Sequence, residues 1–360
     1  MKKYKYAFLE PGRYARGWHI VLFSSELQIG EVKQLHYFGQ DIVAYRGESG
    51  TVAILDAHCP HLGANLGSGE GRVRGDNIAC PFHGWTFNAT GQCVEIPYAT
   101  SIPNKAVNAL KGWPVLEKNG FIALWYATDG EDPEYYLPDI PEWGQPGWGD
   151  WVFYRSRIRA KPCDVIENIV DIAHFPHVHG GLVESWENRF DERSVTQLST
   201  VKRDPNANMI IPPGVVFDLE EARKEAGNDA DAWGDATYHG PSIMYYETES
   251  TSPQMNFKSW WVNCHTVVND NEVDLCSAVM VSSLTDDPLP AEFAQLYPEM
   301  AHVAFSQDVE IWKDKVYREE PILCDGDGPV NKLRRWYEQF YLPHIKSGQQ
   351  KTRTDNRAGP

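Results

Sequence analysis

Two short clusters of cysteine and histidine lie close together in the first third of the sequence. The first is Cys59-x-His61 in CPHLG, and the second is Cys80-x-x-His83 in CPFHGW, with 18 residues between them. Thiolates and imidazoles are the ligands of structural zinc and of iron–sulfur clusters. Two cysteines and two histidines in this order fit a [2Fe–2S] cluster in which the thiolates hold one iron and the imidazoles the other. Structural zinc is the alternative.

The residues that follow each cluster favour iron and sulfur over zinc. Each motif contains a proline, Pro60 or Pro81, and each is followed within two residues by a glycine, Gly63 or Gly84. Glycine allows a tight loop whose backbone N–H groups approach sulfide and thiolate closely, and such contacts tune a reduction potential.

A second group of metal-binding residue types stands about a hundred residues later, in ENIVDIAHFPHVHG. On a helix over residues 163–175, Glu167, Asp171 and His174 would share one face. Pro176 is expected to end this helix and turn His179 back toward the site that His174 faces. Two histidines and one carboxylate, with coordination positions left open, are the ligand set of non-haem Fe(II) oxygenases.

The carboxylate for such a site must come from elsewhere in the chain. A helix is predicted over 291–316, and Asp308 falls inside its apolar stripe, with Gln307 beside it. An ionised carboxylate on an apolar face needs a strong partner or a metal. We therefore expect Asp308 to be the third ligand, and the alternative is a salt bridge to a buried arginine or lysine.

The elements that must position these residues suggest an α+β protein of two domains. Short β-branched and aromatic runs predict strands in the first third, and the region 129–150, rich in Pro, Gly and acid, predicts the boundary. We expect one domain over 1–130, a linker over 131–150 and a second domain over 151–360. The second should hold several strands and the predicted helices. The stretch 204–240 predicts a long loop or a partly helical insertion. The remaining predicted elements are strands at 18–23, 41–46, 51–56, 121–126, 151–159, 242–250, 255–268 and 273–283, and a helix at 330–341.

Composition narrows the class of protein further. Of 360 residues 33 are basic and 50 acidic, which gives a net charge of −17 and argues against a nucleic-acid partner. Apolar runs are too short for a membrane span, and the N-terminus does not read as a signal peptide. Seven cysteines without a disulfide-like spacing favour a cytoplasmic protein, and the five outside the cluster motif are interpreted as small buried hydrophobic residues.

At these motifs the chain resembles the Rieske non-haem iron oxygenases. The stretches QDVEIWKDK, PILCDGDGP and LRRWYEQFY also resemble the C-terminal motifs of 3-ketosteroid 9α-hydroxylase oxygenase components and cholesterol 7-desaturases. The resemblance covers roughly residues 15–345. It implies an antiparallel-β Rieske domain followed by a catalytic domain of the helix-grip type, in which an antiparallel sheet is flanked by helices.

The resemblance also assigns roles to residues. It implies that Cys59, His61, Cys80 and His83 bind the [2Fe–2S] cluster, and that His174, His179 and Asp308 bind a mononuclear Fe(II). Asn168 and Asp171 match positions that support the iron site. Asp171 would contact His174 of its own chain and His83 of the partner subunit in a ring-shaped homotrimer.

The implied function is the terminal oxygenase of a Rieske monooxygenase, in steroid metabolism and lipid degradation. It would insert one atom of O2 into a C–H bond of a steroid-like substrate. A Gly-rich dinucleotide motif is lacking, so NADH electrons should arrive through a separate flavin and iron–sulfur reductase. A hydroxylase or demethylase of smaller aromatic or alkaloid substrates is one alternative, and an electron carrier is another. Five residues are candidates for an apolar pocket, or equally for strand core: Met244, Tyr245, Tyr246, Trp260 and Trp261.

Overall fold

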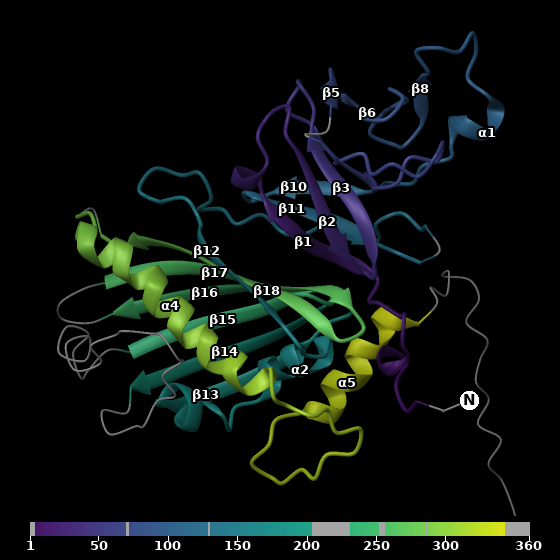
Figure 1. Ribbon diagram of the computed structural model, residues 1–360. Helices are drawn as coiled ribbons and strands as arrows, with labels where there is room; N and C mark the ends of the chain where they lie inside the picture. The colour runs from purple at the N-terminus through teal and green to yellow at the C-terminus, as the bar shows by residue number, and fades with distance from the viewer. Residues whose placement is uncertain are drawn as a thin grey trace, which may run out of the picture.

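The computed structural model describes residues 4–69, 72–128, 130–203, 231–251, 256–285 and 287–342. Three small antiparallel sheets form the N-terminal part, and a seven-stranded antiparallel sheet forms the C-terminal part, as the upper and lower halves of Figure 1 show. This arrangement confirms the predicted α+β class.

The N-terminal sheets have the strand orders β1-β11-β10, β2-β3-β4-β9 and β5-β6-β7-β8. All four strands predicted in this part are present. Of the others, β2 has six residues and was missed, whereas the remaining strands have two to four residues, too few to show an alternation that a sequence could reveal. Their bounds are β1 Gly17–Phe23, β2 Val32–Tyr37, β3 Gln40–Arg46, β4 Val52–Asp56, β5 Arg72–Arg74, β6 Asn77–Ala79, β7 Thr86–Phe87, β8 Cys93–Glu95, β9 Gly112–Trp113, β10 Val115–Lys118 and β11 Phe121–Tyr126.

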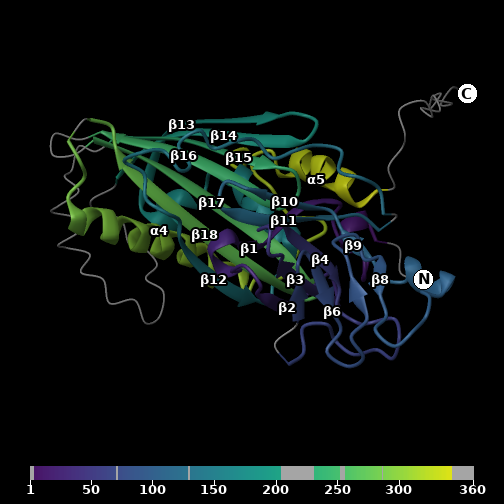
Figure 2. The ribbon, with the colours of Figure 1, turned by 90° about the horizontal axis from the view of Figure 1, so that it is seen from above.

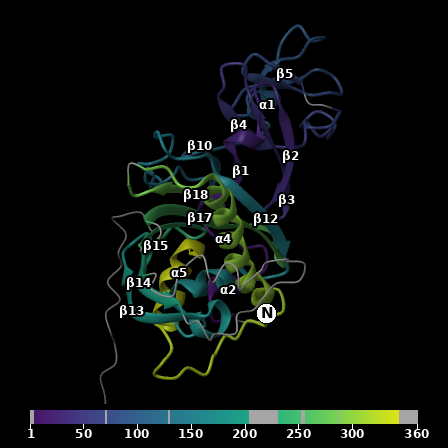
Figure 3. The ribbon, with the colours of Figure 1, turned by 90° about the vertical axis from the view of Figure 1, so that its left-hand side faces the viewer.

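The large sheet has the order β12-β18-β17-β16-β15-β14-β13, and α4 lies across one of its faces (Figures 1 and 3). The strands predicted at 151–159, 242–250, 255–268 and 273–283 are confirmed. The prediction of a loop over 204–240 is wrong at its end, because β15 begins at Asp231, and its part over 204–230 lies outside the described residues. The bounds are β12 Val152–Ile158, β13 Gly181–Phe190, β14 Ser194–Arg203, β15 Asp231–His239, β16 Ile243–Thr251, β17 Asn256–Asn269 and β18 Glu272–Ser283.

Two of the three predicted helices, at 291–316 and 330–341, are present. Helix α4 covers Ala291–Trp312, and α5 covers Val330–Glu338 before a 3-10 turn at Gln339–Tyr341 (η5). The remaining helical segments are short: η1 Ala7–Leu9, η2 Ser24–Glu26, α1 Asn104–Val107, α2 Pro162–Ile166, η3 Glu167–Val170 and η4 Phe175–His179. Within the described ranges, no helix combines the length and the apolar character that a membrane crossing needs.

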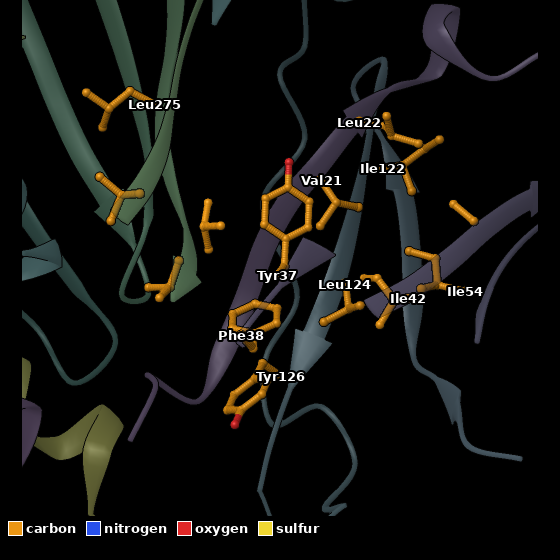
Figure 4. Packing of buried hydrophobic residues seen from close by; sticks show 14 of the residues in the cluster. Val21, Leu22, Tyr37, Phe38, Ile42, Ile54, Ile122, Leu124, Tyr126 and Leu275 are labelled. Carbon is orange, nitrogen blue, oxygen red and sulfur yellow. The ribbon is translucent and has the colours of Figure 1, made fainter. Parts of the chain in front are cut away.

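The two parts of the chain share one hydrophobic core. Figure 4 shows Val21, Tyr37 and Leu124 of the small sheets packed in the same cluster as Leu275 of β18. The backbone N–H of Phe38 also donates to the carbonyl of Val267 at 2.8 Å. On the face opposite α4, the N-terminal part packs over β16, β17 and β18, as the view from above shows (Figure 2).

The segment predicted as a linker, 131–150, lies between β11 and β12 and packs on the large sheet. Glu142 accepts hydrogen bonds from Lys258 at 2.6 Å and from the Trp260 indole at 2.9 Å. Trp143 stacks on Trp151 with ring centroids 5.6 Å apart. These contacts hold the chain firmly where it passes from one part to the other.

Candidate functional site

The two Cys/His motifs form two loops with the same hydrogen-bond pattern. In the first loop, Cys59 N–H donates to Ala64 O at 2.8 Å, and Gly63 N–H donates to Cys59 O at 2.9 Å. In the second, Cys80 N–H donates to Trp85 O at 2.7 Å, and Gly84 N–H donates to Cys80 O at 3.0 Å. Both glycines have positive φ, 79° and 72°, which explains why glycine occupies these positions.

The loops bring the four predicted cluster ligands to one place. The rings of His61 and His83 lie with centroids 4.7 Å apart, and Trp85 stacks on His61 at 4.8 Å. Burial, followed by the neighbouring Cys80 thiol, raises the pKa of Cys59 to about 12. The buried Cys59 thiol would therefore stay protonated at neutral pH unless a bound cation stabilised its thiolate, and two thiols beside two imidazoles are a donor set that fits a metal group.

The spacing of these four side chains favours a cluster over a single zinc ion. Among the described residues, only one set of three or more ligand atoms lies within 4.8 Å, and it belongs to the other site. Structural zinc would need four ligands around one point. A two-iron cluster, in which each iron is held by one pair of ligands, needs no such convergence.

The second site is built by a chain segment that differs from the prediction. A single helix over 163–175 broken by Pro176 was expected, but the helical turns end at Asp171, which is extended with φ −92° and ψ 90°. A second helical segment then begins at Phe175, with Pro176 in its first turn, where the missing N–H costs nothing.

Because of this break, Glu167, Asp171 and His174 do not share one helix face, contrary to the prediction. Glu167 does not point with Asp171 and His174 toward the metal-binding side chains. Its carboxylate accepts from Arg334 Nε at 2.7 Å and lies 3.5 Å from Lys315 Nζ. Glu167 therefore ties η3 to α5, and it is not one of the three converging ligand side chains.

His174, His179 and Asp308 converge from two distant segments. Asp308 Oδ1 lies 3.7 Å from His174 Nε2 and 3.3 Å from His179 Nε2, and the three ligand atoms lie within 4.8 Å of one another. The Asp308 side chain is 13% exposed, and among the described residues no lysine or arginine pairs with it. The alternative of a buried salt bridge is thus not observed, and the set fits one metal ion.

Gln307 orients His179, and Asp171 lies beside His174. Gln307, which is 2% exposed, accepts a hydrogen bond from His179 Nδ1 at 2.8 Å, and Asp171 Oδ1 lies 3.7 Å from His174 Nδ1. Burial opposes ionisation of Asp171, but the contact with His174 overcomes it and lowers the Asp171 pKa. Burial likewise opposes protonation of His179, and the contact with Asp308 raises its pKa. Both Nε2 atoms are left facing Asp308, as a metal requires.

A mainly apolar cavity of about 240 Å³ opens from this ligand set, between α4 and the large sheet. Three of the five predicted pocket residues line it: Met244, Tyr246 and Trp261. Tyr245 and Trp260 belong to the opposite face of the sheet. Its lining is completed by Val165, Asn168, Ile169, Phe175, Gln197, Ala236, Tyr238, Asn263, Cys264, Ala304, Phe305 and Trp312.

Several of these lining residues were missed by sequence reasoning. Gln197 lies on β14, and Ala236 and Tyr238 lie on β15, in strands that the sequence did not reveal. Asn168 lines the cavity on the side of η3. Cys324 is exposed rather than buried, whereas the other cysteines outside the motif, Cys93, Cys163, Cys264 and Cys276, are buried as predicted.

A depression on the outer side of Asp171 carries exposed apolar side chains. It is lined by Asn168, Asp171 and Asp308 together with residues from the end of α4 and the loop before α5. Ile311, Val316 and Leu323 line it and are exposed, and Ile322, next to Leu323 in the chain, is fully exposed. We call these four side chains the outer patch.

Comparisons with known proteins agree with this geometry. Residues 17–110 match the family model of the Rieske [2Fe-2S] domain, and residues 124–341 match that of the 3-ketosteroid 9alpha-hydroxylase C-terminal domain. The chain is 37% identical over 340 residues to a probable 3-ketosteroid-9-alpha-monooxygenase, oxygenase component, of Rhodococcus rhodochrous, covering 92% of this chain and 81% of that protein.

More distant relatives show the same coverage. The chain is 34% identical to the oxygenase component of the 3-ketosteroid-9-alpha-monooxygenase of Mycobacterium tuberculosis, with 92% and 83% covered. It is 30% identical to the cholesterol 7-desaturase of Caenorhabditis elegans, with 92% and 78% covered. The crystal structure of dicamba monooxygenase bound to dicamba has the same fold, with a TM-score of 0.70 at 18% identity over 91% of this chain and 98% of that one.

Proposed function

Because the chain belongs to the family of Rieske oxygenase components that includes the 3-ketosteroid 9α-monooxygenases, we propose that it oxidises a steroid-like ketone as the terminal oxygenase of such a system. The enzyme is a Rieske non-haem iron monooxygenase. The observation that carries the substrate class is the direct opening of the His174/His179/Asp308 set into a cavity with mainly apolar walls.

The residues that would hold the two metal groups are those of the two sites. Cys59 and Cys80 with His61 and His83 would hold the [2Fe–2S] cluster, and His174, His179 and Asp308 would hold the mononuclear iron. When bound, the cluster supplies single electrons and the iron supplies activated oxygen. Hydroxylation, demethylation and desaturation share these ligands, so the product type is left to the experiment below.

The chain itself orients the proposed ligands, excludes water from the cavity and positions the substrate. Gln307 holds His179 in the tautomer whose Nε2 is free, and the Asp171 carboxylate lies 3.7 Å from His174 Nδ1. Phe175, Phe305 and Trp312 enclose the space beside the ligands with apolar surface. The substrate C–H bond is thereby kept in a dry site next to the place where oxygen is activated.

We propose further that the enzyme is a homotrimer in which Asp171 meets His83 of the partner subunit. Exposed apolar side chains surround the cluster loops: Leu62, Phe82 and Tyr98. The outer patch surrounds Asp171. In Figure 1 the strands β5 and β6, which precede the second cluster loop, lie at the far end of the molecule from α2, and Figure 3 shows the same for β5. A head-to-tail ring would cover both apolar areas and bring a cluster close to each iron site.

Electrons are proposed to come from NADH through a flavin and iron–sulfur reductase. The sequence holds no Gly-rich dinucleotide motif, and the name of the relatives, oxygenase component, implies a separate reductase. All seven cysteines are free, which supports our proposal of a reducing, cytoplasmic location. A role in steroid and lipid degradation belongs to the same proposal.

The test is a product assay with labelled oxygen. Purified enzyme, a surrogate reductase and NADH are incubated under ¹⁸O₂ with a panel of 3-ketosteroids and a second panel of aryl ethers and N-methyl alkaloids. Mass spectrometry should find a steroid that has gained one labelled oxygen. A product only in the second panel would transfer the proposal to a hydroxylase or demethylase of small molecules.

A further inference from the structure

One end of the cavity is closed by a pair of aromatic side chains. Trp261 packs on Tyr297 of α4, with ring centroids 6.3 Å apart, and Tyr246 packs on Trp261 at 5.6 Å. Tyr297 precedes the ligand Asp308 by 11 residues, which is about 16 Å along an α-helix. The Tyr246–Trp261 pair therefore lies at the end of the cavity remote from the metal ligands.

Gly234 fixes the direction in which the Tyr246 ring points. A Cβ at Gly234 would stand 2.5 Å from Cε2 and 2.6 Å from the hydroxyl oxygen of Tyr246, so the ring lies directly over this glycine. In the sheet, Tyr246 is opposite Ala236, and Gly234 lies diagonally beyond it, on the side away from Tyr238. The ring thus leans away from the metal ligands, and any other residue at 234 would push it back into the cavity.

A buried hydroxyl network stands behind this pair. Ser259 Oγ bonds to Thr248 Oγ1 and to the Tyr297 hydroxyl, each at 2.8 Å, and it accepts from the Trp261 indole at 2.9 Å. These groups satisfy one another. An alkyl group that extended past Tyr246 would meet these hydroxyl groups, which already bond to one another and would have to lose those bonds to make room. The apolar part of the cavity therefore ends at the Tyr246 ring.

We propose that Tyr246, seated on Gly234, is the specificity-determining residue that limits substrate length. The cavity then accepts compact fused-ring ketones and excludes those that carry an alkyl side chain directed away from the iron. The steroid part of this statement rests on the proposed function, whereas the length limit rests on the geometry of Gly234, Tyr246 and Trp261 alone.

The test measures binding to the iron-loaded enzyme without oxygen, by equilibrium dialysis. One ligand series consists of 3-ketosteroids with side chains of increasing length, and the other of 2-alkylnaphthalenes of increasing chain length. For wild type, affinity should rise with chain length and then fall at a cut-off. Tyr246→Ala should move the cut-off to longer chains, with a gain of about tenfold for each two methylenes that become buried. Gly234→Ala should move it to shorter chains.

The double variant separates the length limit from a general loss of packing. The methyl group that Gly234→Ala adds acts only through the Tyr246 ring. Gly234→Ala should therefore have no further effect on the cut-off once Tyr246 is replaced by alanine. Tyr245→Phe, on the opposite face of the same strand, should leave the cut-off unchanged. Tyr246→Leu replaces Tyr246→Ala if that variant unfolds.

Two results would overturn the proposal: an unchanged cut-off in Tyr246→Ala, or an equal effect of Gly234→Ala in both backgrounds. The proposal would also be overturned if wild type bound neither the steroids nor the naphthalenes. If only the naphthalenes bind and their cut-off shifts as expected, the length limit stands and the steroid substrate is wrong.

Discussion

His179 Nδ1 and Gln307 Oε1 lie 2.8 Å apart, between a histidine on η4 and a glutamine that is buried on α4. A carboxamide oxygen only accepts hydrogen bonds, so Nδ1 carries the proton and the Nε2 lone pair points toward Asp308. Helix α4 therefore supplies one proposed ligand, Asp308, and through Gln307 it fixes the tautomer of a second proposed ligand, His179.

Replacing Gln307 tests this relationship. Gln307→Leu should weaken iron binding by about 10- to 100-fold, because His179 loses the acceptor that fixes its tautomer. Gln307→Glu keeps an acceptor oxygen and should retain the iron. The measurement is iron retained against a chelator, with the cluster absorbance as a control for folding. Equal iron loss in both variants would contradict the role of the hydrogen bond.

Asp171→Asn should leave both metal centres in place and abolish turnover. Its carboxylate lies 3.7 Å from His174 Nδ1 and beside the outer patch, where the partner's cluster is proposed to dock. The measurement is the rate of cluster re-oxidation in a single turnover of pre-reduced enzyme. Asp314→Asn, an exposed carboxylate just beyond α4, serves as the matched control. Re-oxidation at the wild-type rate in Asp171→Asn would rule out the proposed bridge.

The outer patch should be needed for assembly. Ile322 is fully exposed, and Ile322→Glu places a charge where an apolar contact with a second copy is proposed. The variant should elute as a monomer and lose turnover while it keeps the cluster colour. Ile29, 65% exposed and outside the patch, gives the control Ile29→Glu. A trimer that survives Ile322→Glu but not Ile29→Glu would show that the interface lies elsewhere. Light scattering coupled to size-exclusion chromatography measures the oligomeric state of both variants.

Two buried histidines should make the fold sensitive to acid. Burial lowers the pKa of His19 from 6.5 to about 4 and that of His265 to about 3, with His19 adding to the second shift. Between pH 6.5 and about 4 the unfolded chain binds protons that the folded chain cannot, so the free energy of unfolding falls as pH falls. Each histidine contributes a slope of up to about 1.4 kcal/mol per pH unit.

His265→Leu should therefore flatten the dependence of the unfolding free energy on pH over this range. Denaturant titrations at several pH values measure it. His36→Gln is the control, because His36 is largely exposed and pairs with Asp41 at the surface. A slope that His265→Leu leaves as steep as in wild type would show that acid acts through other groups.

The residues that we propose as metal ligands could be selected from the sequence because their chemistry is local. Cys59-x-His61 and Cys80-x-x-His83 are short motifs that fold as tight loops, and Asp308 stood out as a charge inside an apolar helical stripe. The helix break at Asp171 could not be read in the same way. Proline is tolerated in the first turn of a helix, so Pro176 marks a beginning where an ending was expected.

The cavity lining was only half predictable for a different reason. Both faces of β16 and β17 are covered, one by α4 and the other by the N-terminal part, so apolar residues stand at successive positions. Period-two alternation is then lost, and nothing in the sequence distinguishes Tyr246, which lines the cavity, from Tyr245, which faces the other core.

Iron and acid-labile sulfide, counted in wild type and in His174→Ala, test most directly that the chain carries two separate metal centres. Wild type should hold roughly three irons and two sulfides per chain, from one [2Fe–2S] cluster and one mononuclear site. His174→Ala should hold two irons and two sulfides, with the cluster spectrum intact and no turnover. Two irons in wild type, or a colourless His174→Ala protein, would contradict the account.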